Sequence, residues 1–292
     1  MSSLYNQLDY TENIKEIKGV QFGVLSPDEI KDRSVVNVTQ TVLYDSHGEP
    51  VIGGLFDTRM GVIDHGKICP TDNLDNRFCP GYFGHIELAR PVFHIQFIQI
   101  IIKILKCICI RCSKILIDTN DIALNIQNKK KIFNLVVEKC SKVKICGTNC
   151  ENGCGALQPT KYIKDGLSKI YAEWKDKSLD EDIENDNKQL LTAEFIQKIF
   201  RRINNEDCEA IGLSSKWCRP DWLICSILPV CPPSVRPSVR QSGGLRSEDD
   251  ITHKLIDIIK TNNSLKRKIE NEKSLENTVE EWTQVLQYHV AT

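Results

Sequence analysis

Apolar side chains recur at helical spacing between residues 97 and 108. The positions involved are Phe97, Ile101, Ile104, Leu105 and Ile108. A repeat of three or four residues gives one apolar face, so the pattern predicts a helix that buries this face in a core. The surrounding residues 92–117 form the most apolar stretch of the sequence, but polar residues such as Gln99, Lys103 and Lys106 interrupt it. This stretch therefore lacks the composition of a membrane span.

Capping residues and spacing predict further helices. Ser26 can cap a helix, Pro27 suits the first helical position, and Glu29 completes a capping box. Thr192 is placed to cap another helix in the same way. Three segments have apolar residues at helical spacing: residues 192–203, residues 251–262 and residues 275–288.

Other segments are predicted to be extended or irregular. Residues 19–24 alternate in polarity, which is typical of a short strand. Residues 48–91 are rich in Gly, Pro, Asp and Asn, which favours ordered loops over regular elements. The prolines of residues 231–237 disfavour helix before each of them, so this segment is expected to be extended. Residues 241–244 are expected to form a flexible loop tip.

The composition is typical of a globular protein. Of the 292 residues, 41% are hydrophobic and 26% are charged, which excludes wholesale disorder and collagen-like repeats. The 38 Lys and Arg nearly balance the 39 Asp and Glu, so the net charge of −1 says nothing about a nucleic-acid partner. The balance hides a basic region, because residues 97–169 hold 13 Lys and Arg against 5 Asp and Glu. An acidic stretch follows at residues 173–188.

The 13 cysteines are an odd number, and the N-terminus lacks the basic start and apolar core of a signal peptide. Disulfide frameworks belong to secreted proteins, so we expect a protein that is not secreted, with reduced cysteines in a cytosolic or nuclear compartment. The sequence contains no phosphate-binding Gly-x4-Gly-Lys, no Gly-x-Ser-x-Gly and no His-Glu-x2-His motif. No catalytic residues are predicted in this chain.

Four cysteines have the spacing of a metal site: Cys109, Cys112, Cys146 and Cys154. Two pairs of thiolates on separate loops can close a tetrahedral zinc site, and the x2 pair is the usual turn. The neighbouring glycines of the second pair suit tight turns toward the sulfur atoms. The alternatives are a redox Cys-x-x-Cys pair and unpaired core cysteines, and Cys150 could substitute for a distal ligand.

A second cluster has weaker spacing. Cys69, Asp72 and Cys79 offer two good ligands and one acceptable oxygen, whereas Tyr82 is a poor fourth ligand. Histidine nitrogen from His65 or His85 would require rearrangement. The alternative is an ordered loop that is held by its glycines and by packing.

Several long motifs follow each other along the chain. They are GGLFDTRMG at residues 53–61, CPGYFGHIELARPVFH at 79–94, GCGALQPT at 153–160, RPDW at 219–222, LPVCPPSVRPS at 228–238 and LQYHVAT at 286–292. In order and content they resemble the amino-terminal clamp region of the largest subunit of multisubunit DNA-directed RNA polymerases. The eukaryotic messenger-RNA polymerase and its large-DNA-virus relatives are the most similar.

This resemblance implies roles for particular residues. Cys109, Cys112, Cys146 and Cys154 fall on the zinc ligands of the family's clamp. The family's other zinc site has the pattern C-x2-C-x6-C-x2-H, in which Asp72 stands for a cysteine and Tyr82 for the histidine, so we expect weak or absent zinc there. Residues 237–249 align with the family's lid loop, which helps to separate RNA from template DNA. The arginines expected to face nucleic acid are Arg236, Arg240 and Arg246.

The resemblance also implies the architecture. We expect an α+β fold: an irregular, zinc-stapled clamp head with several amphipathic helices and short antiparallel strands. Residues 1–235 would form the clamp core and clamp head with the zinc sites, residues 236–250 a lid-like loop, and residues 251–292 a helical segment that is truncated relative to the family.

The family's magnesium-binding Asn-Ala-Asp-Phe-Asp-Gly-Asp motif does not occur in this sequence. We therefore expect the complete enzyme to bind magnesium outside this chain, which would be a piece of a split subunit, a truncated product or a gene fragment. The implied partners are template DNA, the DNA–RNA hybrid, the remainder of the largest subunit, the second-largest subunit and other subunits, with no membrane. The location would be the nucleus, or the host cytoplasm or virion for a viral protein. The alternative functions are a free-standing zinc-binding interaction module and a thiol redox protein.

Overall fold

The computed structural model describes residues 17–20, 22–118, 128–149, 153–166, 169–174, 188–240, 246–271 and 275–292. The helices are α2 (Pro27–Arg33), α3 (Ile98–Cys107), α4 (Lys129–Cys140), α5 (Ala193–Arg201), α6 (Asn205–Ile211), α7 (Asp250–Glu270) and α8 (Glu276–Ala291). The strands are β1 (Gly84–Phe93), β2 (Lys161–Asp165), β3 (Lys169–Glu173), β4 (Lys188–Leu191), β5 (Ile224–Val230), β6 (Val239–Arg240) and β7 (Arg246–Ser247). This mixture of helices and small antiparallel sheets confirms the predicted α+β class.

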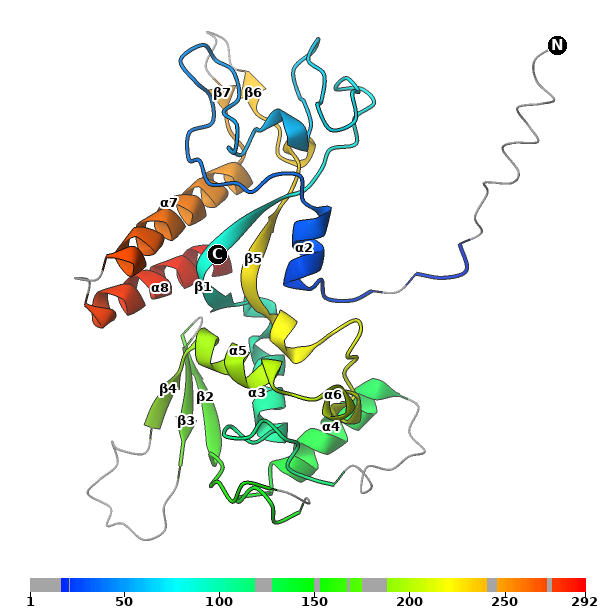
Figure 1. Ribbon diagram of the computed structural model, residues 1–292, viewed down its shortest axis with the longest axis vertical. Coiled ribbons are helices and arrows are strands. Elements are labelled where there is room, and N and C mark those ends of the chain that lie inside the picture. The colour runs from blue at the N-terminus through cyan, green and yellow to red at the C-terminus, as the bar shows by residue number, and fades with distance from the viewer. Residues whose placement is uncertain are drawn as a thin grey trace, which may run out of the picture.

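The molecule has two lobes, which Figure 1 shows one above the other. The lower lobe consists of α3 to α6 and the sheet β2–β3–β4. The upper lobe consists of α2, the hairpin of α7 and α8, the loop of residues 34–83, and the described residues 231–240 and 246–249. The antiparallel ribbon of β1 and β5 connects the lobes, because β1 leads directly into α3 and β5 returns from the lower lobe.

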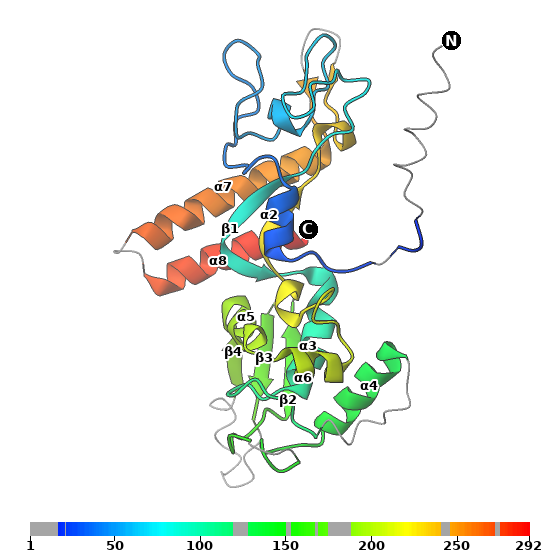
Figure 2. The same cartoon turned by 45° about the vertical axis from the view of Figure 1, so that its right-hand side comes forward.

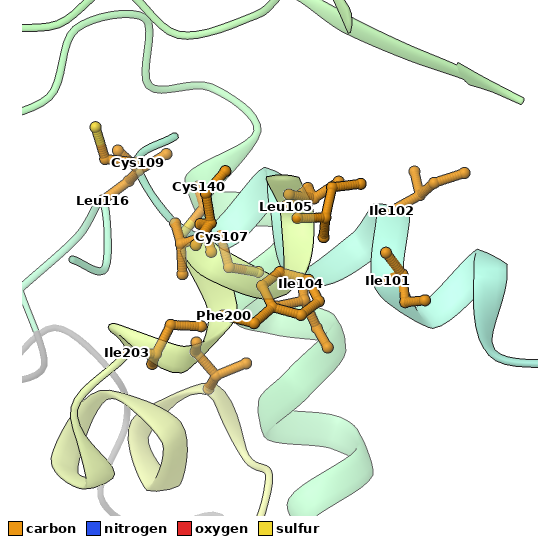
Figure 3. Packing of buried hydrophobic residues seen from close by; sticks show 14 of the residues in the cluster. Ile101, Ile102, Ile104, Leu105, Cys107, Cys109, Leu116, Cys140, Phe200 and Ile203 are labelled. Atoms are coloured by element: carbon orange, nitrogen blue, oxygen red, sulfur yellow. The ribbon is translucent and has the colours of Figure 1, made fainter. Parts of the chain in front are cut away.

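Each lobe has its own hydrophobic cluster. The predicted amphipathic helix is confirmed as α3, and its buried face includes Ile101, Ile104 and Leu105. In Figure 3 Ile104 lies beside Phe200 of α5, and Cys107 at the end of α3 lies beside Cys140 of α4, so α3 packs against both helices in the core of the lower lobe. The upper cluster joins β1 and β5 to the inner faces of α7 and α8.

Two buried amide side chains attach the C-terminal helices to β1. The register of β1 against β5 shifts between Glu87 and Val92, which leaves backbone groups that β5 does not pair. Asn262 of α7 accepts from the N–H of Ala89 at 2.7 Å and donates to the carbonyl of Glu87 at 2.8 Å. Gln287 of α8 accepts from the N–H of Phe93 at 2.6 Å and donates to its carbonyl at 2.9 Å. In Figure 2 both helices lie across this ribbon.

We expect Gln287→Ala to lower the free energy of unfolding by about 1–3 kcal/mol, because it leaves the buried N–H and carbonyl of Phe93 without partners. Gln284, on the same helix, is exposed, and Gln284→Ala should change stability by less than about 0.5 kcal/mol. Urea denaturation of both variants measures the difference. Equal effects would mean that the amide of Gln287 does not hold α8 on the ribbon.

The capped helices are confirmed, and one predicted loop differs. Ser26 and Glu29 form the reciprocal capping box of α2, and the hydroxyl of Thr192 accepts from the N–H of Phe195 in α5. The loop prediction over residues 48–91 is wrong at its end, where β1 begins at Gly84. Its pairing partner β5 lies far along the chain, so local composition does not reveal this strand.

Two further predictions differ from the structure. In the described part of residues 19–24 there is no strand, although the N–H of Val24 donates to the carbonyl of Trp217 at 2.9 Å. The segment of residues 231–237 is not wholly extended, since Pro233–Val235 form a 3-10 turn. The predicted loop tip at residues 241–244 and the acidic residues 175–187 lie outside the described residues.

Among the described helices, none has the length and apolar character needed to cross a membrane.

Candidate metal centre

The first half of the candidate metal centre is a tight turn that follows α3. The N–H of Cys109 donates to the carbonyl of Lys114 at 2.9 Å, and the N–H of Ser113 donates to the carbonyl of Cys109 at 2.8 Å. Ser113 has a left-handed backbone, with φ of 62°. This reversal places Cys109 and Cys112 on one turn, as the x2 spacing predicts.

The second half is a similar hairpin around Cys146 and Cys154. The N–H of Cys146 donates to the carbonyl of Ala156, and the N–H of Gly155 donates to the carbonyl of Cys146, each at 3.0 Å. The backbones of Gly147 and Gly153 touch, because a Cβ added to Gly153 would lie only 2.1 Å from the Cα of Gly147. Glycine is therefore required where the two strands of this hairpin approach each other.

The two turns bring the four predicted sulfur ligands together. The Sγ atoms of Cys109, Cys112, Cys146 and Cys154 all lie within 4.8 Å of one another. The distance between Cys109 and Cys154 is 3.5 Å, and that between Cys112 and Cys146 is 3.7 Å. Tetrahedral zinc with Zn–S bonds of about 2.3 Å separates its sulfur ligands by roughly 3.8 Å. This four-cysteine cluster therefore fits a closed structural zinc site, whereas the substitute ligand Cys150 lies outside the described residues.

The environments of the four thiols differ. A hydrogen bond from the N–H of Ala156 is the main reason that the pKa of Cys154 falls to about 7. Burial raises the pKa of Cys112 and of Cys146. Cys154, the exposed member of the cluster, is thus ready to ionise near neutral pH, and a divalent cation would favour the thiolate of the others.

Gln158 is a further member of this site that the sequence analysis did not identify. Its Nε2 donates to the sulfur of Cys109 at 3.2 Å and to the carbonyl of Ala156 at 2.9 Å. Its Oε1 accepts from the N–H of Ile110 at 3.3 Å, and the residue is only 5% exposed. Gln158 therefore joins the two turns and orients the thiol of Cys109 through a hydrogen bond to its sulfur. Its only sequence signal is its position within the GCGALQPT motif.

The second predicted cluster also forms, with different chemistry. Ligand atoms of Cys69, Asp72 and Cys79, the Asp72 cluster, lie within 4.8 Å of one another. The hydroxyl of Tyr82 donates to Oδ2 of Asp72 at 3.1 Å, so a phenol stands beside the three ligand atoms. This set does not fit a closed four-ligand zinc site, because tyrosine is not among the usual ligands.

Neither neighbouring histidine completes the Asp72 cluster. Nδ1 of His65 lies 3.1 Å from the amide nitrogen of Asn76, and Nδ1 of His85 lies 2.7 Å from the hydroxyl of Ser34, so both nitrogens have partners outside the cluster.

The carboxyl group of Asp72 has a lowered pKa. Although burial opposes its charged form, hydrogen bonds from Leu74, Cys79 and Tyr82 hold the pKa of Asp72 below its usual value.

Over residues 14–292 the sequence matches the family described as RNA polymerase Rpb1, domain 1. The chain belongs to this family. It is 41% identical over 298 residues to the DNA-directed RNA polymerase II subunit RPB1 of Euplotoides octocarinatus, covering 97% of this chain and 60% of the relative. It thus spans about 60% of the length of the curated relative that it matches. The resemblance to the largest polymerase subunit, predicted from the motifs, is confirmed.

The predicted position of Arg236 needs correction within this Rpb1 domain. Arg236 was expected to face nucleic acid, but its side chain is fully buried. It donates to the carbonyls of Leu55 and Cys231 and to the hydroxyl of Thr252 at 3.4 Å, and its guanidinium stacks 5.1 Å from the ring centre of Phe56. Leu55 and Thr252 are distant from Arg236 in the sequence, so its position at the edge of the predicted loop gives no sign of these partners.

The other two arginines of the predicted lid lie on a short ribbon. Arg240 of β6 and Arg246 of β7 are backbone partners in an antiparallel pair. Their side chains and the connecting residues 241–245 lie outside the described residues, so their role in contacting nucleic acid stays a prediction.

Proposed function

We propose that this chain is the N-terminal clamp part of the largest subunit of a DNA-directed RNA polymerase, a nucleotidyltransferase. The family match over residues 14–292 is the observation that carries this proposal. In the assembled enzyme the chain would help to hold template DNA and the DNA–RNA hybrid, while magnesium would bind in a part of the enzyme outside this sequence. The similarity to RPB1 of RNA polymerase II favours a nuclear location, and a large-DNA-virus source stays an alternative.

The proposed role of the four-cysteine cluster is structural. When bound there, zinc would cross-link the turn after α3 to the hairpin around Cys146 and would take no part in nucleotide addition. The protein supplies four sulfurs at suitable distances, and Gln158 orients Cys109. This cross-link would stiffen the lower lobe, which has little regular structure in residues 141–160.

A clamp that holds nucleic acid must be connected mechanically to the rest of the enzyme. The two-stranded ribbon of β1 and β5 provides such a connection between the two lobes.

In the lower lobe, α4 begins with three exposed lysines: Lys129, Lys130 and Lys131. Lys129 pairs with Glu209 at 3.0 Å. We propose that this basic surface, together with Arg240 and Arg246, contacts phosphates without reading sequence.

Affinity purification of the tagged chain from its native cells tests the proposal. We expect the second-largest polymerase subunit and a polypeptide with the Asn-Ala-Asp-Phe-Asp-Gly-Asp motif to be recovered in amounts about equal to the tagged chain. A mock purification from untagged cells is the control for nonspecific recovery.

Recovery of the chain alone would contradict the polymerase assignment. It would favour the free-standing zinc-binding module, which has no polymerase partner. The redox alternative requires that the thiols of Cys109 and Cys112 are accessible and reactive. Cys109 is fully buried, and tight zinc binding by its thiolate would exclude this alternative.

A further inference from the structure

The turn that carries Asp72 repeats the backbone of the first zinc-site turn. The N–H of Cys69 donates to the carbonyl of Leu74 at 2.9 Å, and the N–H of Asn73 donates to the carbonyl of Cys69 at 2.8 Å. Asn73 is left-handed with φ of 57°, as is Ser113 at the same place in the other turn. The two turns therefore share the same backbone hydrogen bonds and the same left-handed position. Asp72 occupies the position that Cys112 has in the four-cysteine cluster.

Both oxygens of Asp72 already have protein partners. Oδ1 accepts from the N–H of Leu74 at 2.9 Å, and Oδ2 accepts from the hydroxyl of Tyr82 at 3.1 Å. The phenol keeps its proton at neutral pH and therefore acts as a donor. A metal that took Oδ2 as a ligand would have to displace this hydrogen bond, and tyrosine would not replace it with a good fourth ligand.

Contacts outside the cluster also hold this loop. The N–H of Tyr82 donates to the carbonyl of Met60 at 2.9 Å, and the hydroxyl of Thr71 donates to the carbonyl of Arg59 at 2.6 Å. Gly81 has φ of 83°, and a Cβ there would lie 2.8 Å from Cβ of Pro232. The loop is thus tied to its surroundings by backbone and packing contacts that need no ion.

We propose that residues 68–82 form a metal-free version of the zinc turn, in which the hydrogen bond from Tyr82 to Asp72 takes the place of the metal. The cysteines Cys69 and Cys79 remain as thiols beside this pair. The chain then binds one zinc ion, at the four-cysteine cluster, and the upper loop keeps its shape when zinc is removed.

Counting zinc in the purified full chain by native mass spectrometry and elemental analysis tests the first part. We expect one zinc per chain in the wild type and in Cys79→Ser, and two in the double variant Asp72→Cys, Tyr82→His, which restores four good ligands to the turn. Two zinc ions in the wild type, with one lost in Cys79→Ser, would overturn the proposal. These counts do not depend on whether the chain assembles into a polymerase.

Hydrogen exchange tests the second part. We expect Tyr82→Phe to accelerate exchange of the Asn73 and Leu74 amides at least tenfold, at unchanged zinc content, because Oδ2 of Asp72 loses its hydrogen-bond donor. Tyr288→Phe is the control, since Tyr288 lies exposed in the distant helix α8. Unchanged exchange in Tyr82→Phe, or collapse of this loop in the wild type after chelation, would show that the hydrogen bond does not hold the turn.

Discussion

Cys112→Ser is expected to abolish zinc binding and to unfold the lower lobe. The substitution removes one of four sulfurs that meet within 4.8 Å and leaves three ligands for the metal. Structural zinc contributes about 10–16 kcal/mol to the folding of small zinc domains. The whole stability of a typical domain, about 5–15 kcal/mol, is of the same size. Without the ion, there would be no metal–sulfur bonds to hold the buried thiols of Cys109 and Cys146 close together.

Cys218→Ser is the matched control, because Cys218 is another partly buried cysteine at the edge of the same hydrophobic cluster. It should retain one zinc and lose no more than about 1–3 kcal/mol of stability. Zinc analysis and hydrogen exchange of α3 and α4 measure both effects. If Cys112→Ser kept protected α3 and α4 amides after complete loss of zinc, the hydrophobic core alone would hold the lobe, and a structural role for the metal would be refuted.

Residue type and spacing located the four-cysteine cluster in the sequence, because few side chains bind zinc and Cys-x2-Cys requires only a short turn. The same reasoning found Cys69, Asp72 and Cys79. It did not assign a role to Gln158, since an amide near a thiolate has no characteristic spacing. It also missed β1, whose pairing with β5 and contacts with Asn262 and Gln287 all come from distant segments.

Arg236 shows the limit of motif-based interpretation most clearly. A basic residue next to a loop suggests contact with phosphate, but a fully buried side chain is not available at the surface for such a contact. In the structure its guanidinium instead joins the loop at Leu55, the segment at Cys231 and the start of α7 at Thr252. Burial lowers the pKa of Arg236, yet arginine stays charged in proteins, so these acceptors are needed to offset its desolvation.

We therefore expect Arg236→Ala to destabilise the upper lobe by about 3–5 kcal/mol, because it creates a cavity and removes the donors to the buried carbonyl of Leu55 and to the carbonyl of the half-buried Cys231. Arg236→Lys should recover only part of this loss, since an ammonium group cannot reproduce the planar fork of donors. Arg201→Ala, on the exposed surface of α5, should change stability by less than about 0.5 kcal/mol.

Urea denaturation and DNA binding at two salt concentrations separate the structural role of Arg236 from the phosphate contact first predicted. The buried arrangement requires Arg236→Ala to lower the unfolding midpoint, whereas a phosphate contact would leave stability unchanged and weaken DNA binding with a smaller salt dependence. The second pattern would contradict the buried position. The first would make Arg236 the residue that fixes the base of the β6–β7 ribbon against α7, since the ribbon begins only three residues after it.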